Sequence, residues 1–186
     1  MGKIILVTGG ARSGKSAFAE KLAASLGKNI AYIATAEIYD GEMAYRVALH
    51  QKRRPAGWKT FEAPREAHVA LATAKKNYDV ALFDCLTMYL SNMLCAMPDS
   101  FSPEECHNAV TSKIAALVQA AEETAGTTIF VTNEVGGGIV PENKLARIYR
   151  DEAGLMNQQV VAAAHQVYLV TCGIPVDIKK LGEHLA

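Results

Sequence analysis

One short stretch limits the folds that this chain can adopt. Residues 9–16 read Gly-Gly-Ala-Arg-Ser-Gly-Lys-Ser and follow the apolar run of residues 4–7. A Gly, four intervening residues and then Gly-Lys-Ser is the spacing of a phosphate-binding loop between a strand and a helix. Its glycines let backbone N–H groups approach phosphate oxygens at a helix N-terminus, where the dipole favours anions. The motif therefore predicts nucleotide binding.

Two side chains of this loop have expected roles in binding. Lys15 is expected to reach the β- and γ-phosphates, and the Ser16 hydroxyl to ligate the Mg²⁺ that the nucleotide carries. The alternative is a glycine-rich turn that matches by chance, but a strand pattern precedes the motif and a helix pattern follows it. The predicted phosphate-binding group comprises Gly9, Gly10, Ala11, Arg12, Ser13, Gly14, Lys15 and Ser16.

Length and composition limit the classes of protein that remain. The 186 residues suit one domain, so residues 1–186 are expected to form a single nucleotide-binding catalytic domain. Nineteen Lys and Arg balance nineteen Asp and Glu, so we expect no nucleic-acid partner. No apolar run is long enough to span a bilayer and no signal-peptide pattern is present, so no membrane insertion is expected. The four cysteines lack zinc-type or C-x-x-C spacing, which favours reduced thiols in the cytoplasm.

Apolar runs alternate with amphipathic segments along the chain. Strands are expected at residues 4–7, 30–35, 58–62, 80–83, 128–132 and 167–170, and helices at residues 14–26, 40–55, 65–76, 88–97, 102–126 and 141–164. Strands without polar alternation, separated by helices, predict an α/β fold with a mostly parallel sheet covered on both faces. After a turn at 173–175, residues 176–178 are expected to return antiparallel and form a C-terminal hairpin.

Ligands of such sheets bind at the carboxyl ends of the strands. This rule gathers the phosphate loop with Thr35, Ala36 and Glu37, with residues 84–87, and with residues 133–138. Asp84 is expected to join the Mg²⁺ shell or to act as base on an acceptor hydroxyl, the alternative being a cap of the next helix. The glycines at 136–138 form either a second phosphate-approaching loop or a flexible turn.

His50 is a candidate nucleophile. Arg46 lies four residues before it, on the same helical face, and a nearby cation keeps the imidazole neutral and nucleophilic. The following cations, at residues 52–54, add positive charge suited to a triphosphate. The alternative is a solvated basic face, and the spacing alone leaves both interpretations open.

The long helix near the C-terminus carries a polar stripe at helical spacing. We expect the stripe to face the site or a neighbouring subunit, the alternative being the solvent face. Its members are Arg147, Arg150, Asp151, Gly154, Asn157 and Gln158. The other histidines share no ligand spacing, so no metal other than nucleotide-bound Mg²⁺ is expected; they are His68, His107, His165 and His184.

Several segments, taken in order, resemble the bifunctional adenosylcobinamide kinase / adenosylcobinamide-phosphate guanylyltransferase family of cobalamin biosynthesis. The similarity covers nearly the whole chain. The matching residues are those at 7–16, 32–35, 42–43, 46, 50, 54–55, 58, 84–87, 131–136, 139–143, 147, 150–151, 154 and 157–158.

The resemblance implies two reactions. The first moves the γ-phosphate of ATP or GTP to the aminopropanol hydroxyl of adenosylcobinamide. The second transfers GMP from GTP to that phosphate through a guanylylated histidine, which the motif places at His50, and releases pyrophosphate. It also implies that Asp84 serves nucleotide binding and the kinase step. With the phosphate-loop motif, this makes His50, Asp84 and Lys15 the expected catalytic residues, and Ser16 and Asp84 the expected holders of Mg²⁺.

The same resemblance implies which other residues bind the nucleotide and how the chain assembles. Residues that match guanine-nucleotide positions are Gln51, Lys52, Arg53, Arg54 and Glu62. The family fold is a RecA-like P-loop domain that forms a trimer. No tightly bound organic cofactor is expected, and the partners are the small-molecule substrates adenosylcobinamide, ATP and GTP.

Two other functions remain as alternatives. One is a P-loop small-molecule kinase that uses the loop and Asp84 without guanylyltransferase activity. The other is a nucleotide-dependent switch. A guanine-specific switch carries Asn-Lys-x-Asp after a strand, and here Asn143-Lys144 is followed by Leu145-Ala146, which lacks the Asp.

Overall fold

A computed structural model describes residues 2–98, 100–123 and 125–183; for Glu42, Arg46, His50 and Arg53 it describes the backbone alone. The strands are β1 (Lys3–Thr8), β2 (Ile30–Ala34), β3 (Lys59–Glu62), β4 (Val80–Asp84), β5 (Thr127–Val131), β6 (Gln166–Thr171) and β7 (Ile174–Asp177). The helices are α1 (Lys15–Leu26), α2 (Gly41–Arg53), α3 (Ala67–Ala74), α4 (Leu86–Cys95), α5 (Pro103–Glu123), α6 (Lys144–Ala163) and α7 (Ile178–Leu181).

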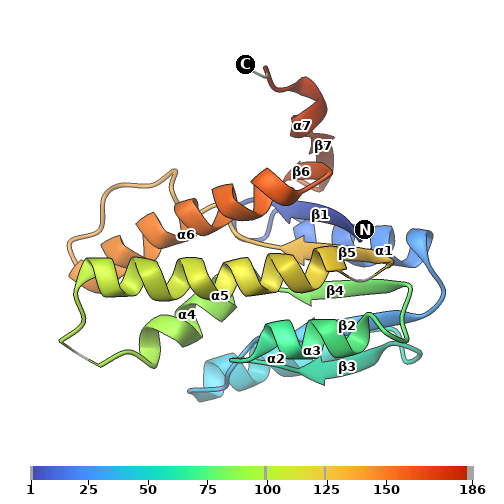
Figure 1. Ribbon diagram of the computed structural model, residues 1–186, viewed down its shortest axis with the longest axis horizontal. Helices are drawn as coiled ribbons and strands as arrows, with labels where there is room; N and C mark the ends of the chain where they lie inside the picture. Colours follow the sequence, from blue (N-terminus) through green and yellow to red (C-terminus); the bar gives the residue numbers. More distant parts are fainter. Residues whose placement is uncertain (1, 99, 124, 184–186) are drawn as a thin grey trace.

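The described strands form one sheet in the order β3-β2-β4-β5-β1-β6-β7 (Figure 1). All neighbours pair in parallel except β6 and β7, which are antiparallel, so the predicted α/β fold with a C-terminal hairpin is confirmed. Strand β5 lies between β1 and β4. Val7 on β1 and Asp84 on β4 both pair with Val131, so the phosphate loop and Asp84 start from the same row of the sheet. That row separates them by two strand spacings, about 10 Å.

Side chains on alternate residues of the strands enter two separate cores. Ile4 and Leu6 of β1 enter one core, which α3, α4, α5 and α6 cover, and Ile5 and Val7 enter the other, which α1 covers. Helices α5 and α6 lie side by side over the first face (Figure 1). Because central strands are buried on both faces, their sequences read as continuous apolar runs, which is why they were predictable.

Three predicted helix starts are corrected by the structure, and one of them is that of α3, which begins at Ala67 and not at residue 65. The long helix α6 begins at Lys144 and not at residue 141, because the Asn143 side chain caps it by accepting from the Ala146 N–H at 3.0 Å. The carbonyls of Pro141 and Glu142 accept hydrogen bonds from Arg147, which satisfies that segment outside the helix. Helix α4 starts at Leu86, two residues earlier than expected.

Side chains cap the N-termini of helices α2 and α5. Asp40 accepts from the Met43 N–H at 2.7 Å at the start of α2. Ser102 and Glu105 form the reciprocal capping box of α5, with N–H to side-chain oxygen distances of 2.7 and 3.1 Å. The hairpin strand β7 begins at Ile174, earlier than expected, and the short helix α7 after it was not predicted.

The described ranges contain no helix that is long and apolar enough to cross a membrane. All four cysteines are free thiols, and Cys85 and Cys106 are buried. Burial raises the pKa of the Cys85 thiol to about 11.

The buried Lys75 leads us to expect an unusual pH dependence of the free energy of unfolding. It is 6% exposed, its Nζ donates to the Ala121 carbonyl at 2.5 Å, and burial lowers its pKa to about 8. Between that pKa and the unfolded value near 10.4 the unfolded chain binds more protons, so stability from this group rises with pH. In urea unfolding, the stability gain of Lys75→Met over wild type is expected to be larger at pH 7 than at pH 10, by about 1–2 kcal/mol. The exposed neighbour variant Lys76→Met serves as control, and an equal gain at both pH values would contradict the expectation.

Candidate functional site

The loop between β1 and α1 is held tightly against the turn of the C-terminal hairpin. Gly9 and Gly14 have φ of 155° and 95°, a region that favours glycine. A Cβ on Gly9 would lie 2.4 Å from the Val170 carbonyl oxygen, and one on Gly14 would lie 3.0 Å from the Gly173 Cα. The Ser13 carbonyl accepts from the Gly173 N–H at 2.8 Å. The β6–β7 turn therefore fixes the shape of the loop, and both glycines are required there.

Lys15 lies inside this loop. It is only 9% exposed, and its Nζ donates to the Gly10 carbonyl at 3.1 Å. Burial lowers the pKa of Lys15, while the neighbouring Cys85 and Asp84 oppose that shift. The ammonium group therefore lies in the field of the strand-end carboxylate Asp84.

The loop suits a phosphate and its cation. The Ser13 Oγ is buried and has no hydrogen-bond partner in the described part of the chain, so it offers an unused polar group in the loop. Ser16 is half-buried in the first turn of α1, and Asp84 ends β4. A hydroxyl and a carboxylate are the hard oxygen ligands that Mg²⁺ prefers, so these residues fit a magnesium-bound nucleotide. Across the described ranges, no three His, Cys, Asp or Glu side chains form a metal-binding cluster.

A network of hydrogen bonds holds Asp84 and the ends of its neighbouring strands. The Tyr32 hydroxyl donates to Asp84 Oδ2 at 2.5 Å. The fully buried Thr35 hydroxyl accepts from the Cys85 N–H and donates to the Cys85 carbonyl, both at 2.9 Å. Asn92 donates to the Thr35 carbonyl at 2.7 Å. The Thr35 side chain thus joins β2 to the residue after Asp84, and its role as a nucleotide ligand stays a prediction.

Helix α2 brings the predicted guanine-nucleotide segment to the edge of the same sheet. Its backbone includes His50, whose side chain lies outside what the structure describes, as do those of Arg46 and Arg53. Gln51 and Lys52 are exposed.

Arg54, which caps the C-terminus of α2, points at the sheet. Its guanidinium lies 3.9 Å from the centroid of the Tyr32 ring and 3.9 Å from Glu62 Oε1. It also donates to the Thr60 hydroxyl at 3.4 Å. Two residues predicted to bind the nucleotide, Arg54 and Glu62, are therefore brought together beside Tyr32.

The segment after β2 carries an acidic group with two partners of its own. Glu37 accepts from the Tyr39 hydroxyl at 2.9 Å and from Arg65 at 3.1 Å. Hydrogen bonds from Tyr39 and then from Arg65 lower the pKa of Glu37. Ala36 lies beside it and is half-buried. Nucleotide binding by Ala36 and Glu37 stays a prediction.

The polar stripe of α6 divides between the strand ends, an open hollow and the segment that precedes the helix. Asn157 faces the strand ends: it accepts from the Thr132 hydroxyl at 2.7 Å and donates to the Asn133 carbonyl at 3.3 Å. Asn133 donates to the Thr87 hydroxyl at 2.6 Å, and the Glu134 N–H donates to the Gly9 carbonyl. These bonds connect α6, the end of β5, the start of α4 and the phosphate loop.

Arg147 donates to the carbonyls of Pro141 and Glu142, and the other members of the stripe border an open hollow of about 380 Å³. A Cβ on Gly154 would meet no atom within 4 Å, so the hollow is deeper at this glycine than it would be with a side chain there. The residues that line it are Gly136, Arg150, Asp151, Gly154, Leu155 and Gln158.

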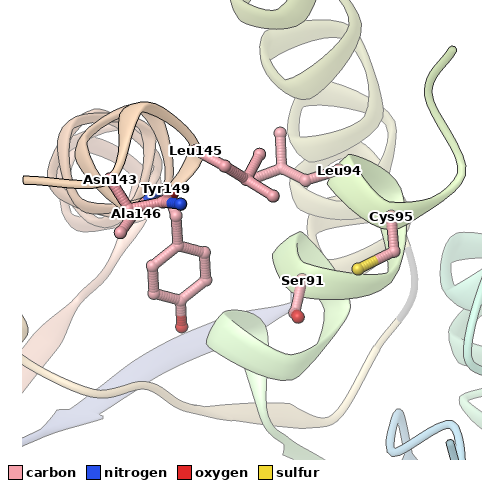
Figure 2. A pocket seen from close by; sticks show the side chains of 7 residues that line it. All are labelled: Ser91, Leu94, Cys95, Asn143, Leu145, Ala146 and Tyr149. Carbon is pink, nitrogen blue, oxygen red and sulfur yellow. Dashed lines mark hydrogen bonds between the residues drawn. The ribbon is translucent and has the colours of Figure 1, made fainter. Parts of the chain in front are cut away.

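A second, apolar hollow of about 290 Å³ lies between α4 and the start of α6. Figure 2 shows Tyr149 of α6 on one side, facing Ser91 and Cys95 of α4. The Tyr149 hydroxyl donates to the Thr87 carbonyl at 3.4 Å, so this hollow adjoins the residues that follow Asp84. Its lining consists of Ser91, Leu94, Cys95, Asn143, Leu145, Ala146 and Tyr149.

The sequence matches one family over nearly its whole length. The family model described as "Cobinamide kinase / cobinamide phosphate guanyltransferase" matches residues 5–178. The chain belongs to this family. It is 43% identical over 181 residues to the "Bifunctional adenosylcobalamin biosynthesis protein CobU" of Salmonella typhimurium strain LT2, covering 95% of this chain and 99% of that protein. It is 41% identical to the protein of the same name in Escherichia coli K12, with the same coverage.

Other similarities agree with that assignment. The "Bifunctional adenosylcobalamin biosynthesis protein CobP" of Pseudomonas aeruginosa is 41% identical over 175 residues, covering 94% of this chain and 96% of that protein. Among solved structures, an ATPase from the type III secretion system of pathogenic bacteria superposes with a TM-score of 0.59 at 15% identity. The match covers 92% of this chain and 52% of that one, so the chain spans about half of the ATPase. This likeness concerns the fold alone.

One feature of the site was not predicted from the sequence. Tyr32 looked like an ordinary core residue of a buried strand, yet its hydroxyl contacts Asp84 and its ring contacts Arg54. The available signal was its place in an otherwise small or aliphatic strand, Ile-Ala-Tyr-Ile-Ala, two residues before the strand ends.

Proposed function

We propose that this chain phosphorylates adenosylcobinamide with ATP or GTP and then transfers GMP from GTP to adenosylcobinamide phosphate, releasing pyrophosphate. Membership in the cobinamide kinase / cobinamide phosphate guanyltransferase family supports both reactions. The observation that carries the proposal is the meeting of a buried Lys15, the phosphate loop and Asp84 at one edge of the sheet. The nucleotide substrates bind at that edge.

In the kinase step, the backbone N–H groups of the loop and Lys15 hold the β- and γ-phosphates. Ser16 and Asp84 would hold Mg²⁺, which when bound neutralises charge on the phosphate oxygens. Asp84 also lies where it can orient the attacking hydroxyl of the corrinoid or accept its proton. The bond from that oxygen to the γ-phosphorus forms as the bond to the β,γ-bridging oxygen breaks.

In the guanylyl step, a ring nitrogen of His50 attacks the α-phosphorus of GTP. The P–N bond forms, the bond from the α-phosphorus to the bridging oxygen breaks, and pyrophosphate leaves. A phosphate oxygen of adenosylcobinamide phosphate then displaces the histidine. The residues proposed to hold the nucleotide are Thr35, Ala36, Glu37, Gln51, Lys52, Arg53, Arg54 and Glu62. The contact of Arg54 with the sheet edge supports this role for the end of α2.

The assembly of the subunits and the location of the protein belong to the same proposal. The protein acts in the cytoplasm, where its four free thiols stay reduced, and takes small-molecule substrates alone. It forms a homotrimer, in line with the family resemblance. Exposed apolar side chains such as Tyr45, Ile139 and Ile174 supply surface that subunits would bury. Light scattering, measured as the protein elutes from a size-exclusion column, gives its molar mass and therefore the number of subunits.

The two reactions are tested with GTP labelled at different phosphorus atoms. Purified protein, Mg²⁺ and adenosylcobinamide are expected to transfer the γ-label to adenosylcobinamide phosphate and the α-label to adenosyl-GDP-cobinamide. Transfer of the γ-label alone would show a small-molecule kinase and contradict the guanylyltransferase. Hydrolysis of GTP without any labelled corrinoid would favour a nucleotide-dependent switch.

A further inference from the structure

The pairing of β2 with β4 explains how Tyr32 reaches the strand-end carboxylate. Tyr32 pairs with Leu82, and Ala34 pairs with Asp84. Tyr32 and Leu82 enter the same core, and alternation along β4 places the Asp84 side chain on that face. A diagonal neighbour two residues further on lies about 7–8 Å away, which a long side chain can span. The phenol of Tyr32 does so and ends 2.5 Å from Asp84 Oδ2.

Tyr32 is held so that it has little freedom to move. It is 2% exposed, and strands β3 and β4 pair with its own strand on either side. The Arg54 guanidinium covers its ring at 3.9 Å, and Arg54 in turn lies near Glu62 and Thr60. A cation over an aromatic face is attracted by the ring quadrupole. The phenol is therefore fixed from the sheet and from the end of α2.

The phenol serves Asp84 as a hydrogen-bond donor. A phenol is protonated at neutral pH, and the 2.5 Å contact with Asp84 Oδ2 is therefore a bond that the hydroxyl donates. A group that contacts a carboxylate ligand in this way fixes its orientation toward a cation.

We propose that Tyr32 is a positioning residue: its buried phenol orients the Asp84 carboxylate for the Mg²⁺-dependent phosphoryl transfer, and Arg54 holds the ring in place from helix α2. The inference rests on the proposed function, because it assigns Tyr32 a part in the kinase step. It gives a role to Tyr32, which lies in the family-matching segment 32–35 without a function assigned there, and connects the end of the helix that carries His50 to the carboxylate of the other reaction.

The test is the Mg²⁺ dependence of γ-phosphate transfer in Tyr32→Phe, which keeps the ring and removes only the hydroxyl. We expect kcat to fall about 10-fold and the Mg²⁺ concentration for half-maximal rate to rise several-fold, since partners of a metal-binding carboxylate are worth about 10–100-fold. The KM for adenosylcobinamide is expected to stay unchanged. Tyr89→Phe is the matched control, because it removes the hydroxyl of another buried tyrosine, on α4.

A double-mutant cycle shows whether Tyr32 acts through Asp84. Tyr32→Phe added to Asp84→Ala is expected to slow the reaction no further than Asp84→Ala alone, because the phenol then has no carboxylate to orient. Rate losses that multiply in the double variant would overturn the proposal.

Further outcomes distinguish a failure of the positioning role of Tyr32 from a failure of the proposed function. Arg54→Met is expected to raise the half-maximal Mg²⁺ concentration by a smaller factor and to have no such effect in the Tyr32→Phe background. A Tyr32→Phe protein with wild-type kinetics, or one whose thermal unfolding shows that it has lost its fold, would overturn the positioning role. If the wild-type protein forms no phosphorylated corrinoid, the proposed function itself fails.

Discussion

Replacing Lys15 with Met is expected to abolish both phosphoryl and guanylyl transfer. Lys15 is the cation inside the phosphate loop. Because its side chain is only 9% exposed, a cation from solvent cannot take its place once the ammonium group is removed. Loss of one preorganised donor to a developing phosphate charge costs about 10²–10³ in rate. Both steps use the same triphosphate anchor, so both rates should fall by that factor or more. The measurement is the initial rate of transfer from γ- and α-labelled GTP at saturating Mg²⁺.

The fold should survive this change. Methionine has nearly the length of the lysine stem, and burial lowers the pKa of Lys15, so removal of this charge is not expected to cost stability. Thermal unfolding without nucleotide is therefore expected at the wild-type temperature or slightly above it. Lys21→Met, on the exposed side of α1, is the control and should keep both activities. Retention of either activity near the wild-type rate in Lys15→Met would exclude the shared anchor.

The central sheet could be predicted from the sequence because its strands are buried on both faces. Continuous apolar runs such as residues 80–83 and 128–132 indicate strands in the core. The phosphate-loop motif, which lies between a strand and a helix, identifies β1 and α1. The C-terminal elements were less predictable for the opposite reason. Ile174 of β7 is 66% exposed and Leu181 of α7 is 74% exposed, so apolar content there does not report burial.

The parts of the site that are local in sequence were predictable, and those that depend on strand register were not. The phosphate loop and Asp84 each follow a strand, so the strand-end rule finds them. The Tyr32–Asp84 hydrogen bond joins residues 52 apart in the chain, and it exists because β2 pairs with β4 in one particular register. The bond from Thr132 to Asn157 likewise requires α6 to cross the end of β5. No pattern within one segment contains that information.

His50→Ala is expected to remove guanylyl transfer and leave the kinase intact. The histidine is needed to form a covalent bond to the α-phosphorus, whereas in the kinase step the corrinoid hydroxyl attacks the γ-phosphorus directly. Transfer of the α-label should fall by about 10³-fold or more, as expected when a covalent nucleophile is lost. Transfer of the γ-label should stay within a factor of about three, because the loop, Lys15 and Asp84 are unchanged.

Intact-protein mass spectrometry tests the covalent step directly. After incubation with GTP and Mg²⁺, wild-type protein should gain one GMP through an acid-labile bond, and His50→Ala should gain none. His107→Ala is the control: His107 lies on α5, 3.2 Å from Glu152 of α6, and its loss should leave the adduct in place. An adduct that persists in His50→Ala would place the nucleophile elsewhere. Loss of both activities together would instead mean that α2 supports the phosphate loop itself, so that the two chemistries share more than their nucleotide anchor.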